Sequence, residues 1–202
     1  MSRELVKEQA PSAMPNLVIV EDEAIVCKLL ERAFSGEYKL SIFESAEAYQ
    51  EGFDPKTPHV LLTDKNLPGI TGIELVEQQR QVTDNFEAVL VTGYADIDSV
   101  ILSMDLGIFS YMRKPFEIQE LKHTVSSALT RLTHRLHRQE VLEQAQVKLA
   151  EYAREIEQSA AQPAAKTDQT RIDLAPLARG LHEIKDSLAQ VTASPLPDPK
   201  GS

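Results

Sequence analysis

The sequence predicts an α/β fold: a five-stranded parallel, doubly wound sheet, followed by a long helical extension. Up to about residue 131, short apolar runs alternate with amphipathic stretches, and beyond it strand-like runs and glycines are almost absent. Such alternation is typical of a parallel sheet with helices on both faces. The chain has 202 residues, of which 42% are hydrophobic. That composition excludes a collagen-like or wholly disordered chain and allows one good core.

Five apolar runs are expected to be strands. Four of them are strongly apolar, and the run at residues 38–43 is weaker. Continuous apolar runs of this length are typical of strands that are buried on both faces of a parallel sheet. The four strong runs are residues 17–20, 60–63, 88–91 and 109–112.

Helical patterns fall between the strands. Residues 24–34, 72–80 and 97–106 each place apolar side chains at helical spacing. We expect the following residues to face the core: Ile25, Leu29, Leu30 and Ala33 in the first helix, Ile73, Val76 and Gln79 in the second, and Val100, Ile101 and Met104 in the third.

Polar residues follow the expected strands at their carboxyl ends, where folds of this class bind ligands. Glu21 and Asp22 follow the first strand, Asp64 the third, Thr92 the fourth and Lys114 the fifth. Carboxylates brought together repel unless a hard cation such as Mg²⁺ bridges them. Asp64 is therefore a candidate nucleophile toward a phosphoryl donor, with Thr92 and Lys114 as partners for phosphoryl oxygens.

Four motifs at these strand ends resemble the receiver domain of two-component response regulators. The resemblance spans residues 16–131 and implies a flavodoxin-like (βα)5 fold. It also implies that Asp64 is phosphorylated from the phosphohistidine of a cognate sensor histidine kinase or phosphotransfer protein. The motifs read VIVEDE at 18–23, LTDKNLPG at 62–69, VTGY at 91–94 and YMRKPF at 111–116.

The same resemblance implies an Mg²⁺ site formed by Glu21, Asp22, Asp64 and the backbone carbonyl of Asn66. Glu21 stands where the family usually has aspartate, which keeps the charge. Asp64, Thr92 and Lys114 would catalyse the domain's own phosphorylation and dephosphorylation, and no separate enzyme activity is expected.

A switch pair and a cis peptide bond are also implied by the resemblance. Thr92 and Tyr111 would reorient on phosphorylation, and Lys114 would sense the phosphoryl group. The alternative for Tyr111 is a packed core tyrosine. The peptide bond between Lys114 and Pro115 would be cis, which is tolerable only before proline.

Residues 117–158 contain no glycine or proline and predict a helix of about 40 residues. Two apolar stripes lie on it: Val125, Leu129, Leu132 and Leu136, then Leu142, Ala145, Leu149, Tyr152 and Ile156. Their registers do not join, so a bend, a change of supercoil or a helix break is expected near Arg138. A long helix with an apolar seam should pair, most simply as a parallel homodimer. The alternatives are folding back on its own receiver domain and a hairpin with the tail.

The remaining segments are expected to be a flexible N-terminus at 1–15, a helical dimerisation extension at 132–158, a linker at 159–172, an amphipathic tail helix at 173–193 and a disordered end at 194–202. In the tail, LHEIKDSLA at 181–189 resembles the H-box of sensor histidine kinases. His182 is therefore a possible second phosphorylation site. The alternative is a polar residue on a solvated face.

The leading hypothesis is a phosphorylation-dependent response regulator that signals through dimerisation or binding of an unknown downstream protein, without a DNA-binding output domain. The alternative is a receiver-containing fragment of a hybrid histidine kinase or phosphotransfer protein. The formal net charge of −10 argues against a nucleic-acid partner. No run of membrane-span length is present, and the single Cys27 cannot form an internal disulfide and is expected to be a buried hydrophobe. We therefore expect a cytoplasmic protein.

Overall fold

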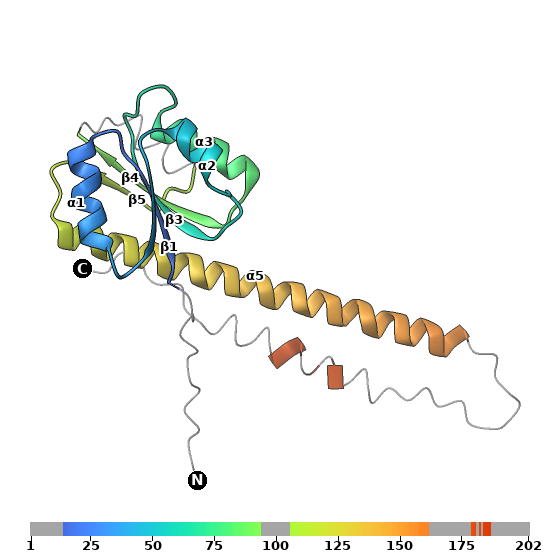
Figure 1. Ribbon diagram of the computed structural model, residues 1–202. Helices are drawn as coiled ribbons and strands as arrows, with labels where there is room; N and C mark the ends of the chain where they lie inside the picture. Colours follow the sequence, from blue (N-terminus) through green and yellow to red (C-terminus); the bar gives the residue numbers. More distant parts are fainter. Residues whose placement is uncertain (1–13, 94–105, 162–178, 181, 183, 187–202) are drawn as a thin grey trace, which may run out of the picture. The chain divides into compact units, whose positions relative to one another are not determined.

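The protein is described by a computed structural model that covers residues 14–93, 106–161, 179–180, 182 and 184–186 (Figure 1). The chain divides into two compact units, Met1–Leu132 and Thr133–Ser202. Several expected segments lie largely or wholly outside the described residues. They are the flexible N-terminus, the helix at 97–106, most of the linker and tail helix, and the end at 194–202.

The described strands form a five-stranded parallel sheet in the order β2-β1-β3-β4-β5, which confirms the predicted doubly wound fold. Each strand overlaps a predicted apolar run, with its ends moved by one or two residues. Every residue of β3 and β4 is buried, as continuous apolar runs require. The strands are β1 (Asn16–Val20), β2 (Lys39–Phe43), β3 (His59–Asp64), β4 (Phe86–Thr92) and β5 (Ser110–Arg113).

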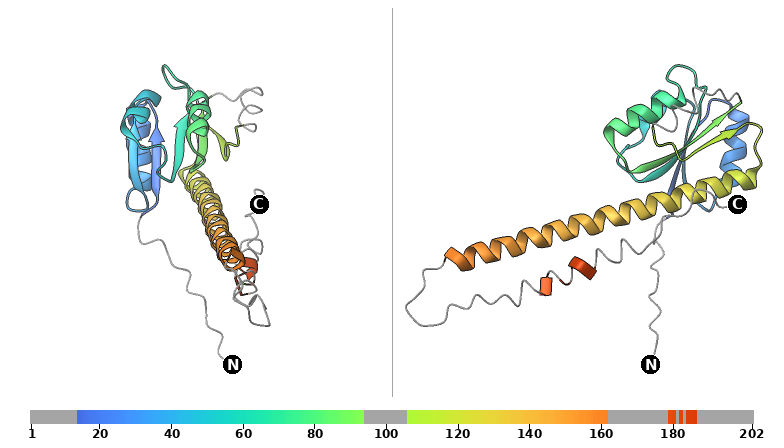
Figure 2. Two further views of the ribbon diagram at one scale, coloured as in Figure 1. Left: turned by 90° about the vertical axis from the view of Figure 1, so that its right-hand side faces the viewer. Right: turned by 180° about the vertical axis from the view of Figure 1, so that it is seen from behind.

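Helices cover both faces of the sheet (Figure 2). Helix α1 (Ala24–Phe34) occupies the predicted range, and α3 (Gly72–Val82) begins at a capping box formed by Thr71 and Glu74. Helix α2 (Ala46–Gly52) was not located from the sequence, because seven residues are too few to show helical periodicity. Its signal is Ser45, whose hydroxyl accepts a hydrogen bond from the Ala48 amide.

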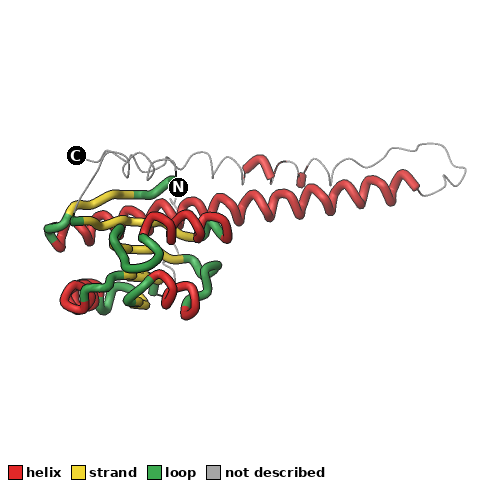
Figure 3. The backbone as a smooth tube through the Cα atoms, turned by 90° about the horizontal axis from the view of Figure 1, so that it is seen from above, coloured by secondary structure: helices red, strands yellow, loops and turns green. Residues whose placement is uncertain are grey.

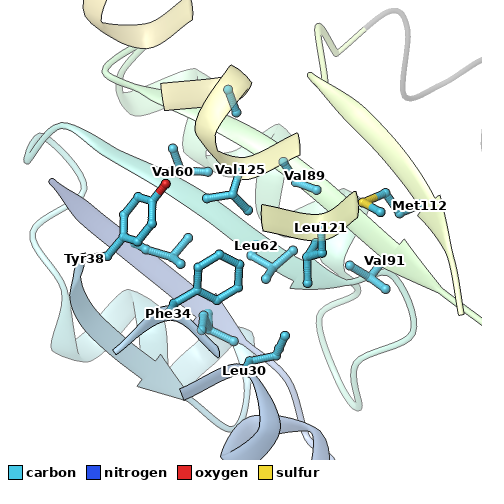
Figure 4. Close-up of a cluster of buried hydrophobic side chains, with 13 residues drawn as sticks. Leu30, Phe34, Tyr38, Val60, Leu62, Val89, Val91, Met112, Leu121 and Val125 are labelled. Atoms are coloured by element: carbon cyan, nitrogen blue, oxygen red, sulfur yellow. The ribbon is translucent and has the colours of Figure 1, made fainter. Parts of the chain in front are cut away.

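Two apolar clusters form the core, one on each face of the sheet. Helix α1 and the first part of α5 (Ile118–Ala161) pack on one face through Leu30, Phe34, Leu121 and Val125 (Figure 4). Helices α2 and α3 pack on the other face. The sheet is thereby buried on both sides, and its carboxyl edge is left to polar residues.

The predicted apolar face of α1 is partly wrong. Leu30 and Phe34 are buried, but Ile25 is 84% exposed and Leu29 is 49% exposed. Because each residue turns the helix by about 100°, Leu29 lies about 120° and Ile25 about 160° from the centre of a stripe formed by Leu30 and Phe34. Two apolar side chains of α1 therefore face solvent in the described structure.

Helix α5 is continuous from Ile118 to Ala161, so of the three alternatives predicted near Arg138 the helix break is excluded (Figure 3). It also includes the first three residues of the predicted linker. Val125 and Leu132 of the first stripe are buried in the first unit, where Val125 joins the core of the sheet. In the second stripe, Leu142 and Leu149 are 42% and 45% exposed. Of the helices in the described part of the chain, none combines the length and the apolar content needed to cross a membrane.

Candidate functional site

The candidate site lies at the carboxyl edge of the sheet, where the strand order reverses between β1 and β3. Glu21 directly follows β1, and Asp64 is the last residue of β3. Thr92 ends β4, and Lys114 comes one residue after β5. A crevice at such a reversal point is the usual ligand site of a doubly wound sheet. The fold thus brings together four side chains that are far apart in the sequence.

Three carboxylates meet at this edge. Glu21, Asp22 and Asp64 each offer an oxygen atom, and these atoms all lie within 4.8 Å of one another. Glu21 and Asp64 are only 2% and 7% exposed, whereas Asp22 is exposed. Burial raises the pKa of Glu21, and the nearby charge of Asp64 raises it further against the opposing effect of Lys114. A divalent cation with oxygen ligands and open water positions fits this donor set.

Lys114 is the cation of the site. Its Nζ lies 2.6 Å from Asp64 Oδ2 and 3.0 Å from Glu21 Oε2, with Glu23 farther away at 3.5 Å. Burial disfavours the charged ammonium, but its hydrogen bonds to Asp64 and Glu21 outweigh burial and raise the pKa of Lys114. The ammonium therefore stays charged beside the Asp64 carboxylate, where it can also pair with an anionic ligand.

The loop after β3 also orients Asp64. The Asn66 amide donates a hydrogen bond of 2.8 Å to Asp64 Oδ1, and the Asn66 side-chain amide lies 3.4 Å from Thr92 Oγ1. Because Lys114 binds Oδ2, both carboxylate oxygens of Asp64 have donors. The Asp64 carboxylate is therefore held in one orientation.

Thr92 and Tyr111 lie on the neighbouring strands β4 and β5. Thr92 is fully buried. The Tyr111 hydroxyl is buried, and no hydrogen-bond partner for it lies among the residues that the structure describes. A buried hydroxyl without a partner costs about 1–3 kcal/mol. Within the described part of the chain, the hydroxyl of Tyr111 is therefore a buried polar group without a hydrogen bond.

Sequence reasoning missed two residues that shape this edge. Gly72, the first residue of α3, lies so close to β3 that a Cβ atom would overlap the Asp64 carbonyl. Glu47 of α2 accepts a hydrogen bond of 3.2 Å from the Ile70 amide and so holds the loop between β3 and α3. The bond between Lys114 and Pro115 is cis, as the resemblance implied. Cys27 is half-buried rather than fully buried, and its thiol donates to the Glu21 carbonyl.

His182 lies in the second unit, whereas the carboxylate site lies in the first. Its side chain is 74% exposed, and its Nε2 atom lies 3.5 Å from Asp186 Oδ2, one helical turn away. Ile184, two residues on, is 6% exposed. Gly180 approaches Tyr152 of α5 so closely that a Cβ atom would overlap the ring. The segment around His182 therefore has a covered side and a solvent side, with His182 on the latter.

Comparisons with known proteins agree with this geometry. A model of the response regulator receiver domain matches residues 17–126. The DNA-binding transcriptional regulator NtrC of Klebsiella pneumoniae is 33% identical over 113 residues, which cover 55% of this chain and 24% of NtrC. Sporulation initiation phosphotransferase F of Bacillus subtilis is 28% identical over 115 residues, covering 56% of this chain and 92% of that protein. The chain thus spans about a quarter of the NtrC relatives that it matches.

Solved structures show the same fold. FixJ-N has a TM-score of 0.53 and 26% identity, covering 58% of this chain and 95% of its own. The response regulator StyR has a TM-score of 0.65 and 22% identity, covering 89% of this chain and 96% of its own. At that identity, the likeness to StyR shows the fold alone.

Proposed function

Because the chain belongs to the family of response regulator receiver domains, we propose that it is a phosphorylation-dependent response regulator whose phosphoryl acceptor is Asp64. The observation that carries the proposal is the contact of Lys114 with Asp64 and Glu21, beside the exposed Asp22. This arrangement combines a nucleophile, a fixed cation and a cluster of oxygen ligands at one edge of the sheet. The phosphoryl donor is the phosphohistidine of a cognate sensor histidine kinase or phosphotransfer protein.

In the proposed reaction, a carboxylate oxygen of Asp64 attacks the phosphorus atom of the donor. The oxygen–phosphorus bond forms as the nitrogen–phosphorus bond breaks, and the electron pair goes to the donor imidazole, which takes a proton from solvent. Lys114 pairs with one phosphoryl oxygen, and the Thr92 hydroxyl donates a hydrogen bond to another phosphoryl oxygen. Attack of water on the same phosphorus atom later breaks its bond to the Asp64 oxygen, which releases inorganic phosphate and returns Asp64 as a carboxylate.

Glu21, Asp22, Asp64 and the Asn66 carbonyl would hold Mg²⁺ in this site. The bound ion would neutralise negative charge on the phosphoryl oxygens during transfer. The protein's own contribution is to hold the carboxylates together, with Glu21 buried and the Asp64 oxygens oriented by Lys114 and the Asn66 amide.

The output acts through protein–protein contact or dimerisation by the extension of α5, in a cytoplasmic protein. Leu142 and Leu149, seven residues apart on the second stripe, are about half exposed and could pair with a second copy or a downstream protein. Because the NtrC relatives are matched over only a quarter of their length, their DNA binding is not carried over. Salt-dependent binding of the full chain to duplex DNA would contradict a purely protein-based output.

Incubation of the full chain with acetyl phosphate and Mg²⁺, followed by intact-mass spectrometry, tests the acceptor. The wild type should gain a single phosphoryl group that alkali removes, as an acyl phosphate requires. Asp64→Asn should abolish that adduct, whereas Asp54→Asn, an exposed aspartate that caps a turn, should not. An adduct that persists in Asp64→Asn overturns the proposal.

His182 is a second candidate for phosphorylation, in a phosphotransfer protein or a fragment of a hybrid kinase. The observation that favours it is its 74% exposed ring beside the Asp186 carboxylate. A phosphohistidine is acid-labile and stable to alkali. The second candidate predicts that a phosphorylated kinase partner gives such an adduct in Asp64→Asn and not in Asp64→Asn/His182→Asn. Absence of the adduct from Asp64→Asn rejects this function.

A further inference from the structure

An ion pair joins α5 to the interior of the sheet at the end of the first unit. Arg131 Nη2 lies 2.6 Å from Glu87 Oε2, and the Glu87 side chain, on β4, is 0% exposed. A buried carboxylate is costly unless a cation accompanies it, so such a pair contributes little net stability. It does fix where the two partners lie relative to each other. The position of the Arg131 side chain is therefore fixed more strongly than that of an arginine without such a partner.

The same guanidinium binds the loop that leads into β5. Arg131 Nη2 donates a hydrogen bond of 3.1 Å to the Gly107 carbonyl, and its guanidinium carbon lies 5.1 Å from the centre of the Phe109 ring. Gly107 has a positive φ of 65°, so its carbonyl is presented by a turn that favours glycine. One side chain of α5 thus holds both the start of β4 and the approach to β5.

These contacts lie at the amino edge of the sheet, opposite Asp64. Glu87 pairs with Val60 near the start of the strands, whereas Asp64 pairs with Val91 near their ends. Arg131 directly precedes Leu132, which is 2% exposed and is the last residue of the first unit. Arg131 is therefore placed where α5 leaves the domain that contains Asp64.

A proposed switch residue connects the carboxyl edge of the sheet to the amino edge along the chain. β5, which carries Tyr111, begins three residues after Gly107. A rearrangement of Tyr111 can therefore reach Gly107 through residues 108–110, and Arg131 contacts Gly107 directly.

We propose that Arg131, through Glu87 and the Gly107 carbonyl, is the positioning residue that couples the state of Asp64 to the extension of α5 beyond Leu132. This inference rests on the proposed function, because it requires Asp64 to change state. Lysine cannot replace Arg131 fully, since an ammonium lacks the planar guanidinium group that lies over the Phe109 ring while Nη2 contacts the two oxygens.

The chain supplies a matched control in Arg80 of α3. Arg80 Nη2 lies 3.4 Å from the same Gly107 carbonyl, and its guanidinium carbon lies 4.2 Å from the centre of the Phe86 ring. Arg80→Met thus removes a comparable arginine from the same loop, and this arginine belongs to α3 rather than to α5. If the response of the α5 extension is lost in the Arg131 variant but kept in Arg80→Met, the loss reflects the positioning role of Arg131. A loss in both variants would reflect a general loosening of the loop.

The test compares hydrogen–deuterium exchange of the full chain with and without beryllofluoride and Mg²⁺. Glu87→Leu/Arg131→Met removes both charges, which buried sites tolerate better than loss of one. Occupancy of Asp64 is read separately from the ¹⁹F resonance of bound beryllofluoride. In the wild type and in Arg80→Met, occupancy should change the exchange of residues 133–155. In the double variant, exchange near Asp64 should respond as in the wild type, while the response at 133–155 falls at least about fivefold.

Retention of the 133–155 response in the double variant overturns the inference, as does an equal loss in Arg80→Met. A wild type that binds beryllofluoride without any response at 133–155 rejects the coupling alone and leaves Asp64 as the acceptor. A wild type that binds no beryllofluoride instead rejects the proposed function on which the inference rests.

Discussion

Lys114 shows how one side chain serves both the resting site and the proposed reaction. It lies between the Asp64 and Glu21 carboxylates and is charged because those contacts outweigh its burial. Sequence position alone predicted that Lys114 would reach this edge. It did not predict the bridge to Glu21, since residues 93 positions apart carry no spacing signal.

Lys114→Met should slow phosphorylation of Asp64 by acetyl phosphate about 10²-fold, because the charge that pairs with the phosphoryl oxygens is lost. Mg²⁺ should bind at least as tightly, since a competing cation leaves the carboxylates. The matched control is Lys122→Met, which removes the same charge from a surface pair with Glu37. Phosphorylation kinetics and Mg²⁺ titration measure both effects, and an unchanged rate in Lys114→Met would reject its role.

His59 should make stability depend on pH. It is fully buried, and since its Nδ1 must donate to the Thr57 carbonyl, its Nε2 accepts from the Tyr49 hydroxyl. Burial lowers the pKa of His59 to about 4, so the unfolded chain binds the proton more readily. The contribution of His59 to the free energy of unfolding should therefore be constant above about pH 6.5. Between pH 6.5 and 4 it should fall by up to about 3 kcal/mol.

Denaturant titrations of the wild type and His59→Gln over this pH range measure the effect. The free energy of unfolding of His59→Gln should depend less steeply on pH than that of the wild type. His123→Gln, at an exposed position, should show the wild-type dependence. Equal slopes in the wild type and His59→Gln would show that His59 does not titrate differently in the two states.

At the level of elements, the buried strands were predictable because their apolar runs are continuous. The faces of amphipathic helices were less so. Ile25 and Leu29 were assigned to the core because helical spacing defines a wide arc, and only the packing of Leu30 and Phe34 shows which part of it is covered. Helix α2 was missed because its signal is the Ser45 cap rather than a period.

The exposed apolar side of α1 should contact the phosphoryl donor protein, because α1 begins directly beside Asp22 and Glu23. Ile25→Glu should lower the rate of phosphoryl transfer by about tenfold. The donor is the phosphorylated domain of a kinase that phosphorylates the wild type. Its rate with acetyl phosphate should not change. Val82→Glu, an exposed apolar position at the far end of α3, is the control. Equal transfer rates for Ile25→Glu and the wild type would place the donor elsewhere.

The close approach of α3 to β3 should make Gly72 intolerant of a side chain. Gly72→Ala forces a Cβ atom against the Asp64 carbonyl and the Leu90 side chain, which should lower the free energy of unfolding by about 2 kcal/mol. Gly93→Ala enters open space and should change stability by less than about 0.5 kcal/mol. Denaturant unfolding of both variants measures the difference, and equal stabilities would refute the close packing.

For the whole molecule, the sequence predicted the fold and the residues of the carboxylate site, because parallel strands place their carboxyl ends at one edge. It did not predict the long-range pairs that hold the site and the exit of α5, such as Glu87 with Arg131. Nor did the sequence predict that the two apolar stripes of α5 have different surroundings. The first packs on the sheet through Val125 and Leu129, and the second presents Leu142 and Leu149 to solvent.

The central claim is that a phosphoryl group on Asp64 acts through the extension of α5. The most direct test is the molar mass and the scattering radius in solution, with and without beryllofluoride and Mg²⁺. It compares the full chain with a chain that ends at Leu132, the end of the first unit. The full chain should change its mass or radius when the mimic binds, and the shorter chain should not change its mass. A full chain that binds the mimic and keeps both values would contradict the account.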